Sequence, residues 1–280
     1  MQTIIKIIES GRTIQGLERT HVLMDVHSPG RRLRHNEETR FCLFSNQPTA
    51  QLFPSKKSMH ADEGQFASPP DGEPATAAME NARGEFIIQS AEEQARANFY
   101  ILLATLLLAP PSAELLHALA NADPIAGETG DLESAWEQLV LVAGIMDAAA
   151  VREEFDALFV STGTPLINPH ASLYLSGFMM DRPLAALRDA LRELGLARQG
   201  SAVELEDHLG SLFETMALLI QQGRGVRTQQ AFFNEHIAGW ADACLEDIRA
   251  ADKANFYVHV AQLIQSFLFV ERNAFEMGGG

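Results

Sequence analysis

Apolar residues recur at intervals of three and four from residue 90 onward, the spacing that places side chains on one face of a helix. The first such segment opens with Ser90 and Glu93, which have the spacing of a capping box. It continues to Leu108 and then meets Pro110-Pro111, where a helix cannot continue. The pattern therefore predicts a helix between Ser90 and the proline pair.

The same periodicity continues to the end of the chain. It predicts helices from Ser112, from Asp131, around Phe155–Phe159, from Pro183 to Gly195, from Ser201, through Phe232, Trp240 and Cys244 as one long helix, and through Phe256 to Leu268. No alternating stretch of strand length competes with this pattern after residue 90. The sequence therefore predicts an all-α fold, with one helical-bundle domain over residues 86–280.

Residues 1–85 follow no sustained period, and Ser, Pro and Gly interrupt them repeatedly, as at Ser68-Pro69-Pro70. Met1–Ile8 has the composition of a short strand or helix, but no nearby segment offers it a partner, and we expect this N-terminal extension to be largely disordered. Met59 and Met79 lie close to the change in composition. Either is an alternative translation start, which would make the extension a mis-assigned start.

The formal charge of −16 is unevenly distributed. Residues 1–58 hold nine Lys and Arg against five Asp and Glu, so residues 59–280 hold 12 against 32. Such an acidic body disfavours nucleic acid and anionic membrane as partners and attracts a basic one. The simpler interpretation is that the charge serves solubility alone.

The chain shows no export or membrane signal. No run approaches eighteen apolar residues, and Arg31-Arg32 precedes Leu33 and Arg34 rather than an apolar stretch. The two cysteines, Cys42 and Cys244, are too few for a disulfide framework. These features favour a cytoplasmic location.

The stretch Glu204–Gly210 is the densest polar motif in the helical region. On a helix that starts at Ser201, Glu204, Asp207, His208 and Ser211 form a polar strip along the edge of an apolar face. A structural interpretation also holds, because Ser201 and Glu204 have capping-box spacing and Asp207 suits a helix N-terminus. On that interpretation His208 is a buried, hydrogen-bonded side chain.

A proline-flanked loop, Pro165–Tyr174, lies about thirty residues upstream. Pro165 and Pro169 prevent helix formation and fix a turn, which alone accounts for their presence. The loop also carries Asn168, His170, Ser172 and Tyr174. Polar groups with one amphipathic aromatic suit a groove for an extended peptide.

Together these segments resemble the TorD/DmsD/NarJ family of maturation chaperones for molybdoenzymes, over roughly residues 90–270. The matching elements are Glu154–Phe159, Thr162–Pro165, Pro169–Tyr174 and Glu204–His208. Two positions depart from the family pattern. Leu205 stands where the family has proline, and Ala171 stands where it has an acidic residue before the serine.

The resemblance implies an all-helical protein without a cofactor or metal, which is not an enzyme. It would bind the twin-arginine signal peptide of a molybdoenzyme precursor in the cytoplasm and assist cofactor insertion before export. The residues that the resemblance assigns to signal-peptide binding are Pro165, Pro169, Ser172, Tyr174, Glu204, Asp207, His208 and Ser211. Asp207 would pair with a signal arginine, His208 would orient the surface, and Tyr174 would contact the apolar part.

Two other functions stay open at this stage. One is a helical adaptor or regulator outside redox-enzyme maturation. The other is a metal-dependent hydrolase that uses Glu204, Asp207 and His208, although only Glu204 and His208 have one-turn spacing. The segment Gly223-Arg224-Gly225 lacks the flanks of a phosphate-binding loop. The chain is expected to be a monomer or a homodimer.

Overall fold

The computed structural model describes residues 23–25, 90–125, 130–160, 163–198 and 202–278. The expectations for disorder in residues 1–85 and for a short element at Met1–Ile8 therefore lie outside the described residues, apart from residues 23–25. Within the described ranges the predicted all-α fold is confirmed. The helices are α2 (Ala91–Leu108), α3 (Ala113–Ala120), α4 (Gly130–Ile145), α5 (Ala148–Phe159), α6 (Ala171–Ser176), α7 (Arg182–Glu193), α8 (Leu209–Gln221), α9 (Val226–His236), α10 (Ala241–Ala250) and α11 (Tyr257–Gly278).

The helix starts at Ser90 and Ser112 follow the predicted chemistry. The Ser90 hydroxyl accepts a hydrogen bond from the Glu93 backbone at 3.1 Å, and Ser112 accepts one from Leu115 at 3.2 Å. Pro183 lies in the first turn of α7, and Gly195, just beyond its end, has a φ of 74°. Local capping rules therefore fix these boundaries.

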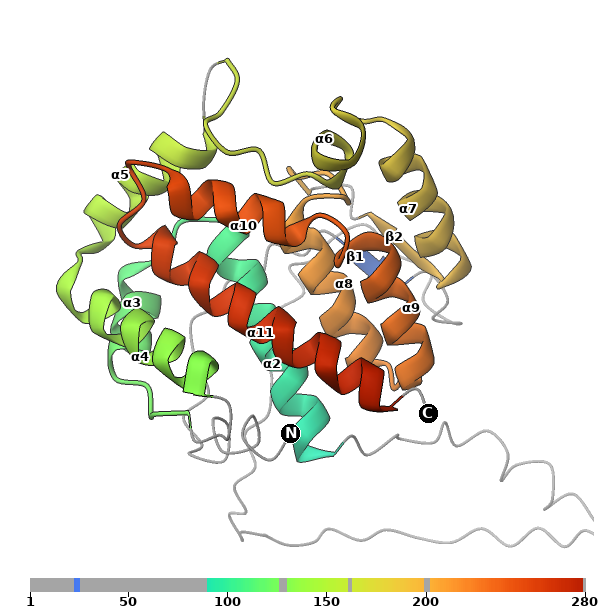
Figure 1. The fold of residues 1–280 in the computed structure, drawn as a ribbon, viewed down its shortest axis with the longest axis horizontal. Helices are drawn as coiled ribbons and strands as arrows, with labels where there is room; N and C mark the ends of the chain where they lie inside the picture. The colour runs from blue at the N-terminus through green and yellow to red at the C-terminus, as the bar shows by residue number, and fades with distance from the viewer. Residues whose placement is uncertain (1–22, 26–89, 126–129, 161–162, 199–201, 279–280) are drawn as a thin grey trace, which may run out of the picture. The chain divides into compact units, whose positions relative to one another are not determined.

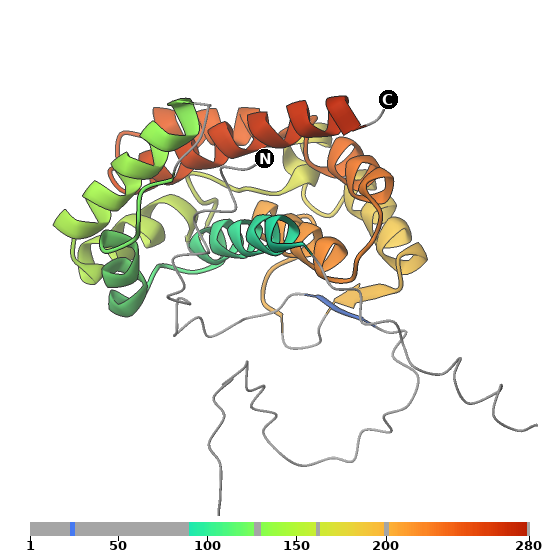
Figure 2. The ribbon, with the colours of Figure 1, turned by 90° about the horizontal axis from the view of Figure 1, so that it is seen from below.

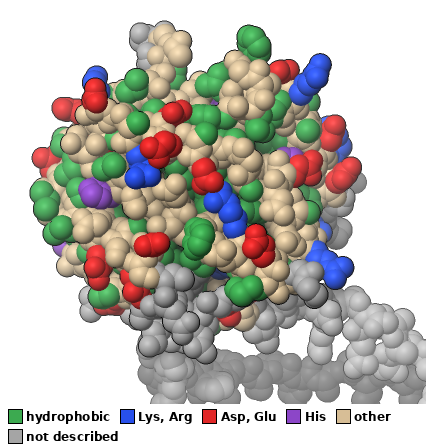
Figure 3. Space-filling view, in the orientation of Figure 1, with side chains coloured by type: hydrophobic (Ala, Val, Ile, Leu, Met, Phe, Trp, Pro, Cys, Tyr) green, Lys and Arg blue, Asp and Glu red, His purple; other side chains and the backbone are tan. Residues whose placement is uncertain are grey.

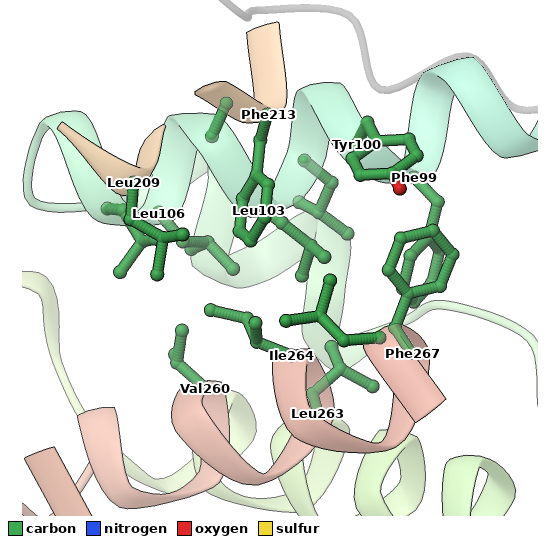
Figure 4. Close-up of a cluster of buried hydrophobic side chains, with 14 of the residues drawn as sticks. Phe99, Tyr100, Leu103, Leu106, Leu209, Phe213, Val260, Leu263, Ile264 and Phe267 are labelled. Atoms are coloured by element: carbon green, nitrogen blue, oxygen red, sulfur yellow. The ribbon is translucent and has the colours of Figure 1, made fainter. Parts of the chain in front are cut away.

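Helices α2 and α8 pack along each other, and α11 crosses them to close the core (Figures 1 and 2). Figure 4 shows Leu103 and Leu106 of α2, Phe213 of α8, and Ile264 and Phe267 of α11 directed into one cluster. Each of these five side chains is fully buried. Burying one such side chain contributes roughly 1.5–3 kcal/mol, so this three-helix contact contributes substantially to stability.

Aromatic rings join the three core helices at the other end of the same cluster. The Tyr100 ring of α2 lies 5.7 Å from Phe213 and 4.9 Å from Phe267, between centroids. Its hydroxyl donates to the Glu271 carboxylate at 2.8 Å, which also accepts bonds from Arg96 at 2.7 Å. Because Glu271 is 1% exposed, Arg96 and Tyr100 rather than water stabilise its negative charge.

Gly210 allows α8 to approach α2 closely at the start of α8. A Cβ atom at this position would lie 2.7 Å from Cγ of Leu108. A side chain at position 210 would force the Leu108 side chain to move. The contact fixes where α8 begins, and therefore where the segment before it lies.

The two remaining groups of helices lie on opposite sides of this core (Figures 1 and 2). α3, α4 and α5 lie on one side, and α6, α7 and α9 lie on the other. No single helix in the described ranges has both the length and the apolar character to cross a membrane. Only α4 and α5 taken together pass that test, as a pair bent by 116°.

Three sequence predictions were wrong. The helix expected from Ser201 begins at Leu209, and Ser201 itself lies outside the described residues. The long helix through Trp240 is two helices, because α9 ends at His236, Gly239 follows, and α10 starts at Ala241. A short strand, β2 (Leu196–Arg198), occurs where none was expected.

Strand β2 forms an antiparallel pair with β1 (Leu23–Asp25). Leu23 lies opposite Arg198, and Asp25 lies opposite Leu196. Backbone pairing with a distant segment has no local periodic signal, which is why residues 196–198 read as a loop between helices. The pairing places three residues of the N-terminal extension beside the helical domain.

Glu154 explains part of the motif Glu154–Phe159. Its carboxylate accepts hydrogen bonds from the backbone N–H groups of Asn255, Phe256 and Tyr257, at 2.8, 2.9 and 2.7 Å. These groups open α11, so a side chain from α5 caps that helix. Phe155 and Phe159 both contact the Tyr257 ring.

We predict that Glu154→Gln lowers the free energy of unfolding by about 2–3 kcal/mol, because the Gln amide group presents donors to backbone donors. The side chain is 6% exposed, so water cannot replace the lost acceptor. Urea denaturation measures the effect. The exposed neighbour Glu153 provides the matched control, and Glu153→Gln should change stability by less than about 0.5 kcal/mol. Equal effects of the two substitutions would contradict the capping role.

Candidate functional site

The proline loop and the Glu204–His208 segment meet through two backbone hydrogen bonds. The Ala171 N–H donates to the Asp207 carbonyl at 2.9 Å, and the Leu209 N–H donates to the Pro169 carbonyl at 2.8 Å. They pair His170 with His208 as an antiparallel bridge. His170 is the N-cap of α6 and His208 is the N-cap of α8. The bridge therefore places the N-termini of these two helices side by side.

The Asp207 carboxylate caps α6 from outside that helix. Its Oδ2 accepts a hydrogen bond from the Ser172 backbone N–H at 3.0 Å and another from the Ser172 hydroxyl. His170, the residue at the N-cap position, makes no side-chain capping bond itself. A carboxylate at a helix N-terminus is also favoured by the helix dipole. Asp207 therefore caps the N-terminus of α6, as Ser90 caps α2 and Ser112 caps α3 from their own N-cap positions.

The second carboxylate oxygen of Asp207 is in a different situation. Oδ1 is buried and has no hydrogen-bond partner among the described residues, and the whole residue is 0% exposed. An unpartnered buried acceptor costs roughly 1–3 kcal/mol. Such a cost at the junction of two segments marks Asp207 as a position worth testing by substitution.

His208 is held in a neutral, oriented state. Its Nδ1 accepts a hydrogen bond from the Gly210 N–H at 3.1 Å, so the neutral ring carries its proton on Nε2. Burial and, as the smaller cause, the adjacent His170 together lower the pKa of His208 to about 3. The His170 ring packs edge-on at 5.0 Å between centroids.

His170 links the loop to Glu204. Its Nδ1 bonds to the Asn168 side chain, and its Nε2 lies 3.7 Å from Glu204 Oε2. Burial lowers the pKa of His170, against the Asp207 carboxylate, which raises it. Burial raises the pKa of Glu204, against Arg198, which lowers it. The Glu204 side chain is 37% exposed, whereas that of His170 is 9% exposed.

Further bonds fix the turn that precedes α8. The Ser211 hydroxyl donates to the Leu205 carbonyl at 3.0 Å. Glu206 receives two bonds from the Arg188 guanidinium of α7, at 3.0 and 2.9 Å. Arg198 donates to the carbonyl oxygens of Ala202 and Glu204. These contacts explain why residues 202–207 are not helical, because their backbone and side chains are bound to three other elements.

Tyr174 lies at another part of α6. Its ring stacks on Trp240 at 5.4 Å, and its hydroxyl donates to Asp247 Oδ2 at 2.8 Å. Burial raises the pKa of the Tyr174 hydroxyl, and nearby Cys244 and Asp247 add to the shift. Trp240 and Asp247 were not expected in the site, because they are far away in sequence and belong to no motif.

The structure brings most of the predicted site residues together but buries five of the eight. Ser172, Asp207 and Ser211 are 0% exposed and His208 is 4% exposed. Pro169 is also buried, while Pro165, Tyr174 and Glu204 are partly exposed. The predicted polar strip on a helix is wrong, because Glu204 and Asp207 precede α8 and face different partners. Whether these residues bind a peptide stays a prediction.

The hydrolase alternative needs Glu204, Asp207 and His208 to converge. Asp207 Oδ2 faces Ser172, His208 Nδ1 faces the Gly210 N–H, and Glu204 faces His170. Across residues 90–125, 130–160, 163–198 and 202–278 no group of three or more His, Cys, Asp or Glu is arranged to hold a metal ion. The three side chains in question have separate partners.

The neutral state of His208 predicts a pH dependence of stability. Its pKa in the folded chain, about 3, lies below the ordinary 6.5, so the unfolded chain binds more protons between these values. Stability due to this group is therefore complete above about pH 6.5 and is lost as the pH falls. The variant His208→Asn keeps an acceptor for the Gly210 N–H but has no group to protonate. We predict that, below about pH 6, its free energy of unfolding falls more slowly with decreasing pH than that of the parent, by about 1.4 kcal/mol per pH unit.

Thermal or urea unfolding at pH 7.5, 5.5 and 4.5 measures this difference. At pH 7.5 the two proteins should be similar in stability, and the variant should become the more stable of the two as the pH falls. Parallel curves over the whole range would contradict a buried neutral His208.

Comparison with known proteins places the region that contains this site in one family. The family model for the nitrate reductase delta subunit matches residues 126–246, which include the proline loop, α6, the Glu204–His208 segment and α8. The match therefore covers both segments joined by the backbone bridge.

Curated proteins with similar sequences carry related names. Chaperone protein TorD of Photobacterium profundum is 28% identical over 126 residues, which are 41% of this chain and 58% of that protein. The probable Tat proofreading chaperone DmsD of Haemophilus influenzae is 30% identical over 115 residues, 40% of this chain and 56% of that protein. Chaperone protein TorD of Aliivibrio fischeri is 25% identical over 201 residues, covering 64% of this chain and 94% of that protein.

The chain spans a little over half the length of the first two of these relatives. The family model, the names of the relatives and the helical fold agree with the resemblance carried by the motifs at Glu154, Pro169 and Glu204. The region that carries the site is therefore similar to the TorD/DmsD/NarJ family.

Proposed function

We propose that this chain is a cytoplasmic maturation chaperone that binds the precursor of a molybdoenzyme through its twin-arginine signal peptide. It holds the precursor until the cofactor is inserted, and export follows. The helical domain of residues 86–280 carries this function. The observation that supports the proposal best is the backbone bridge between Pro169–Ala171 and Asp207–Leu209, which joins both motifs within the region matched by the nitrate reductase delta subunit model.

The charge of the chain supports a basic partner. Residues 59–280 hold 12 Lys and Arg against 32 Asp and Glu, and a field of that sign attracts a basic peptide and speeds its association. A twin-arginine signal offers a basic start followed by an apolar stretch. The acidic domain is complementary to the first part of such a peptide.

The two acidic motif residues have different accessibility, and we assign them different roles. Glu204 is partly exposed and its nearest described charge partner is His170, at 3.7 Å. It is therefore the motif carboxylate that an arginine of the signal peptide reaches, in a charge-assisted bond. Asp207 is buried and binds Ser172, so it positions α6 beside that contact.

This assignment predicts that Glu204→Gln weakens binding of a twin-arginine peptide about tenfold at low salt, since one charge-assisted bond is worth roughly 1.5–3 kcal/mol. The unfolding midpoint should stay unchanged, because the side chain is partly exposed. The salt dependence of binding should also become shallower. Calorimetric titration of the full chain with Arg-Arg and Lys-Lys versions of one synthetic signal peptide measures these effects.

Two further variants complete the test. The exposed acidic residue Glu276 of α11 is the matched control, and Glu276→Gln should bind like the parent. Asp207→Asn should lower the unfolding midpoint and weaken both peptides equally, because it acts through the position of α6. The proposed function is wrong if the parent binds neither peptide. The role of Glu204 is wrong if Glu204→Gln binds the Arg-Arg peptide as the parent does.

A further inference from the structure

The end of α6 exposes apolar side chains that the site residues do not account for. Leu175 is 50% exposed, Phe178 73% and Met180 70%. They lie within six consecutive residues, between the half-buried Tyr174 and Asp181 at the start of α7. Figure 3 shows hydrophobic side chains at the surface over α6 and the segment that joins it to α7. We call Leu175, Phe178 and Met180 the α6 surface.

The backbone of this segment is strained at one of the exposed apolar residues, Met180. α6 ends at Gly177, whose φ is 82°. Met180 has a φ of 57°, and it is the one non-glycine residue with a positive φ in the described part of the chain. A long side chain in that conformation costs of order 1 kcal/mol or more, and residues of this kind concentrate at ligand sites. The turn therefore holds an unfavourable backbone together with an exposed apolar side chain.

The α6 surface rests on a well-defined base. The Tyr174 ring stacks on Trp240, which is 3% exposed, and its hydroxyl binds Asp247. At the other end of α6, Asp207 and the histidine bridge hold the helix N-terminus. α6 is therefore held at both of its ends, and its exposed side chains have a defined position.

Acidic groups lie at both ends of α6. Glu204 is beside His170 at the N-terminus, while Asp247 and Asp181 lie near the C-terminus, where Arg182 is the neighbouring cation. Helix α6 has six residues, which span about 9 Å at 1.5 Å per residue. An extended peptide covers that distance in about three residues. A peptide with a basic pair at Glu204 would thus place a following apolar run on the α6 surface.

We propose that the α6 surface receives the apolar segment of the client's signal peptide, with its arginines held at Glu204. Phe178, Met180 and Leu175 make this contact and select an apolar run of residues over a polar one. The buried motif residues Ser172, Asp207 and His208 position α6 and do not touch the peptide. This inference rests on the proposed function, and it assigns the apolar contact to residues outside both family motifs.

The experiment titrates the full chain with two synthetic peptides. Both peptides carry an Arg-Arg pair. In one the pair is followed by a run of Leu and Ala residues, and in the other by a run of Ser and Gly residues of equal length. The double variant Phe178→Ser, Met180→Asn should bind the Leu/Ala peptide at least about tenfold more weakly and the Ser/Gly peptide unchanged. Asparagine is chosen for position 180 because it tolerates a positive φ.

The matched control changes two equally exposed apolar residues elsewhere, Ile145 at 72% and Met277 at 77%. The double variant Ile145→Ser, Met277→Ser should bind both peptides like the parent. Equal losses in the two double variants, or no loss at Phe178 and Met180, would overturn the inference while leaving the proposed function intact. If the parent binds neither peptide, the proposed function and this inference fail together.

A second measurement uses the unaltered chain. A Leu/Ala peptide with a photoreactive group in its apolar run is cross-linked and the adducts are mapped by mass spectrometry. Adducts within residues 174–181 support the inference. Adducts confined to α4 or α11 overturn it.

Discussion

The junction between residues 169–172 and 207–209 is the constraint on which the site depends. Two backbone hydrogen bonds and the Asp207–Ser172 contact connect segments 35 residues apart. They fix the first turn of α6 and the first turn of α8 at once, because both N-cap residues belong to the bridge. The close approach of Gly210 to Leu108 then ties this junction to α2 and the core. Without these contacts α6, a six-residue helix, would have too few internal bonds to keep its place.

Burial gives the junction its chemical character. His208 stays neutral because protonation would place a charge where water is excluded, and the ring therefore serves as a cap for α8. Asp207 stays bound to the start of α6, where donor groups face its Oδ2. The polar residues that identify the family are thus interior groups that shape the surface. The surface itself is made by Glu204, Tyr174 and the exposed apolar residues after Leu173.

Most of the fold could be predicted from the sequence, since apolar periodicity, serine caps and prolines act locally. Ser90, Ser112 and Pro183 marked helix starts correctly. The failures have a common cause in contacts between distant residues. Residues 202–208 have helical periodicity, but Ala171, Ser172 and Arg188 bind their backbone and side chains instead. β2 depends likewise on residues 23–25.

The sequence allowed the residue types of the candidate site to be predicted, but not which of their side chains are exposed. The motifs at Pro169 and Glu204 pointed to one junction, and the structure brings them together. Sequence spacing alone could not show that Asp207 and Ser172 are buried, because that depends on α6 folding over the turn before α8. The exposure of Phe178 and Met180 could not be predicted for a similar reason. An apolar residue in a loop is exposed or buried according to the turn, and here the turn after α6 leaves Met180 70% exposed.

Recovery of the tagged chain from its own host, with bound proteins identified by mass spectrometry, tests the central claim most directly. The proposed function predicts one dominant partner, the precursor of a molybdenum-containing oxidoreductase with its twin-arginine signal still attached. The partner should be lost when the signal is deleted. A partner set dominated by proteins that lack such signals would contradict the account and would indicate a helical adaptor.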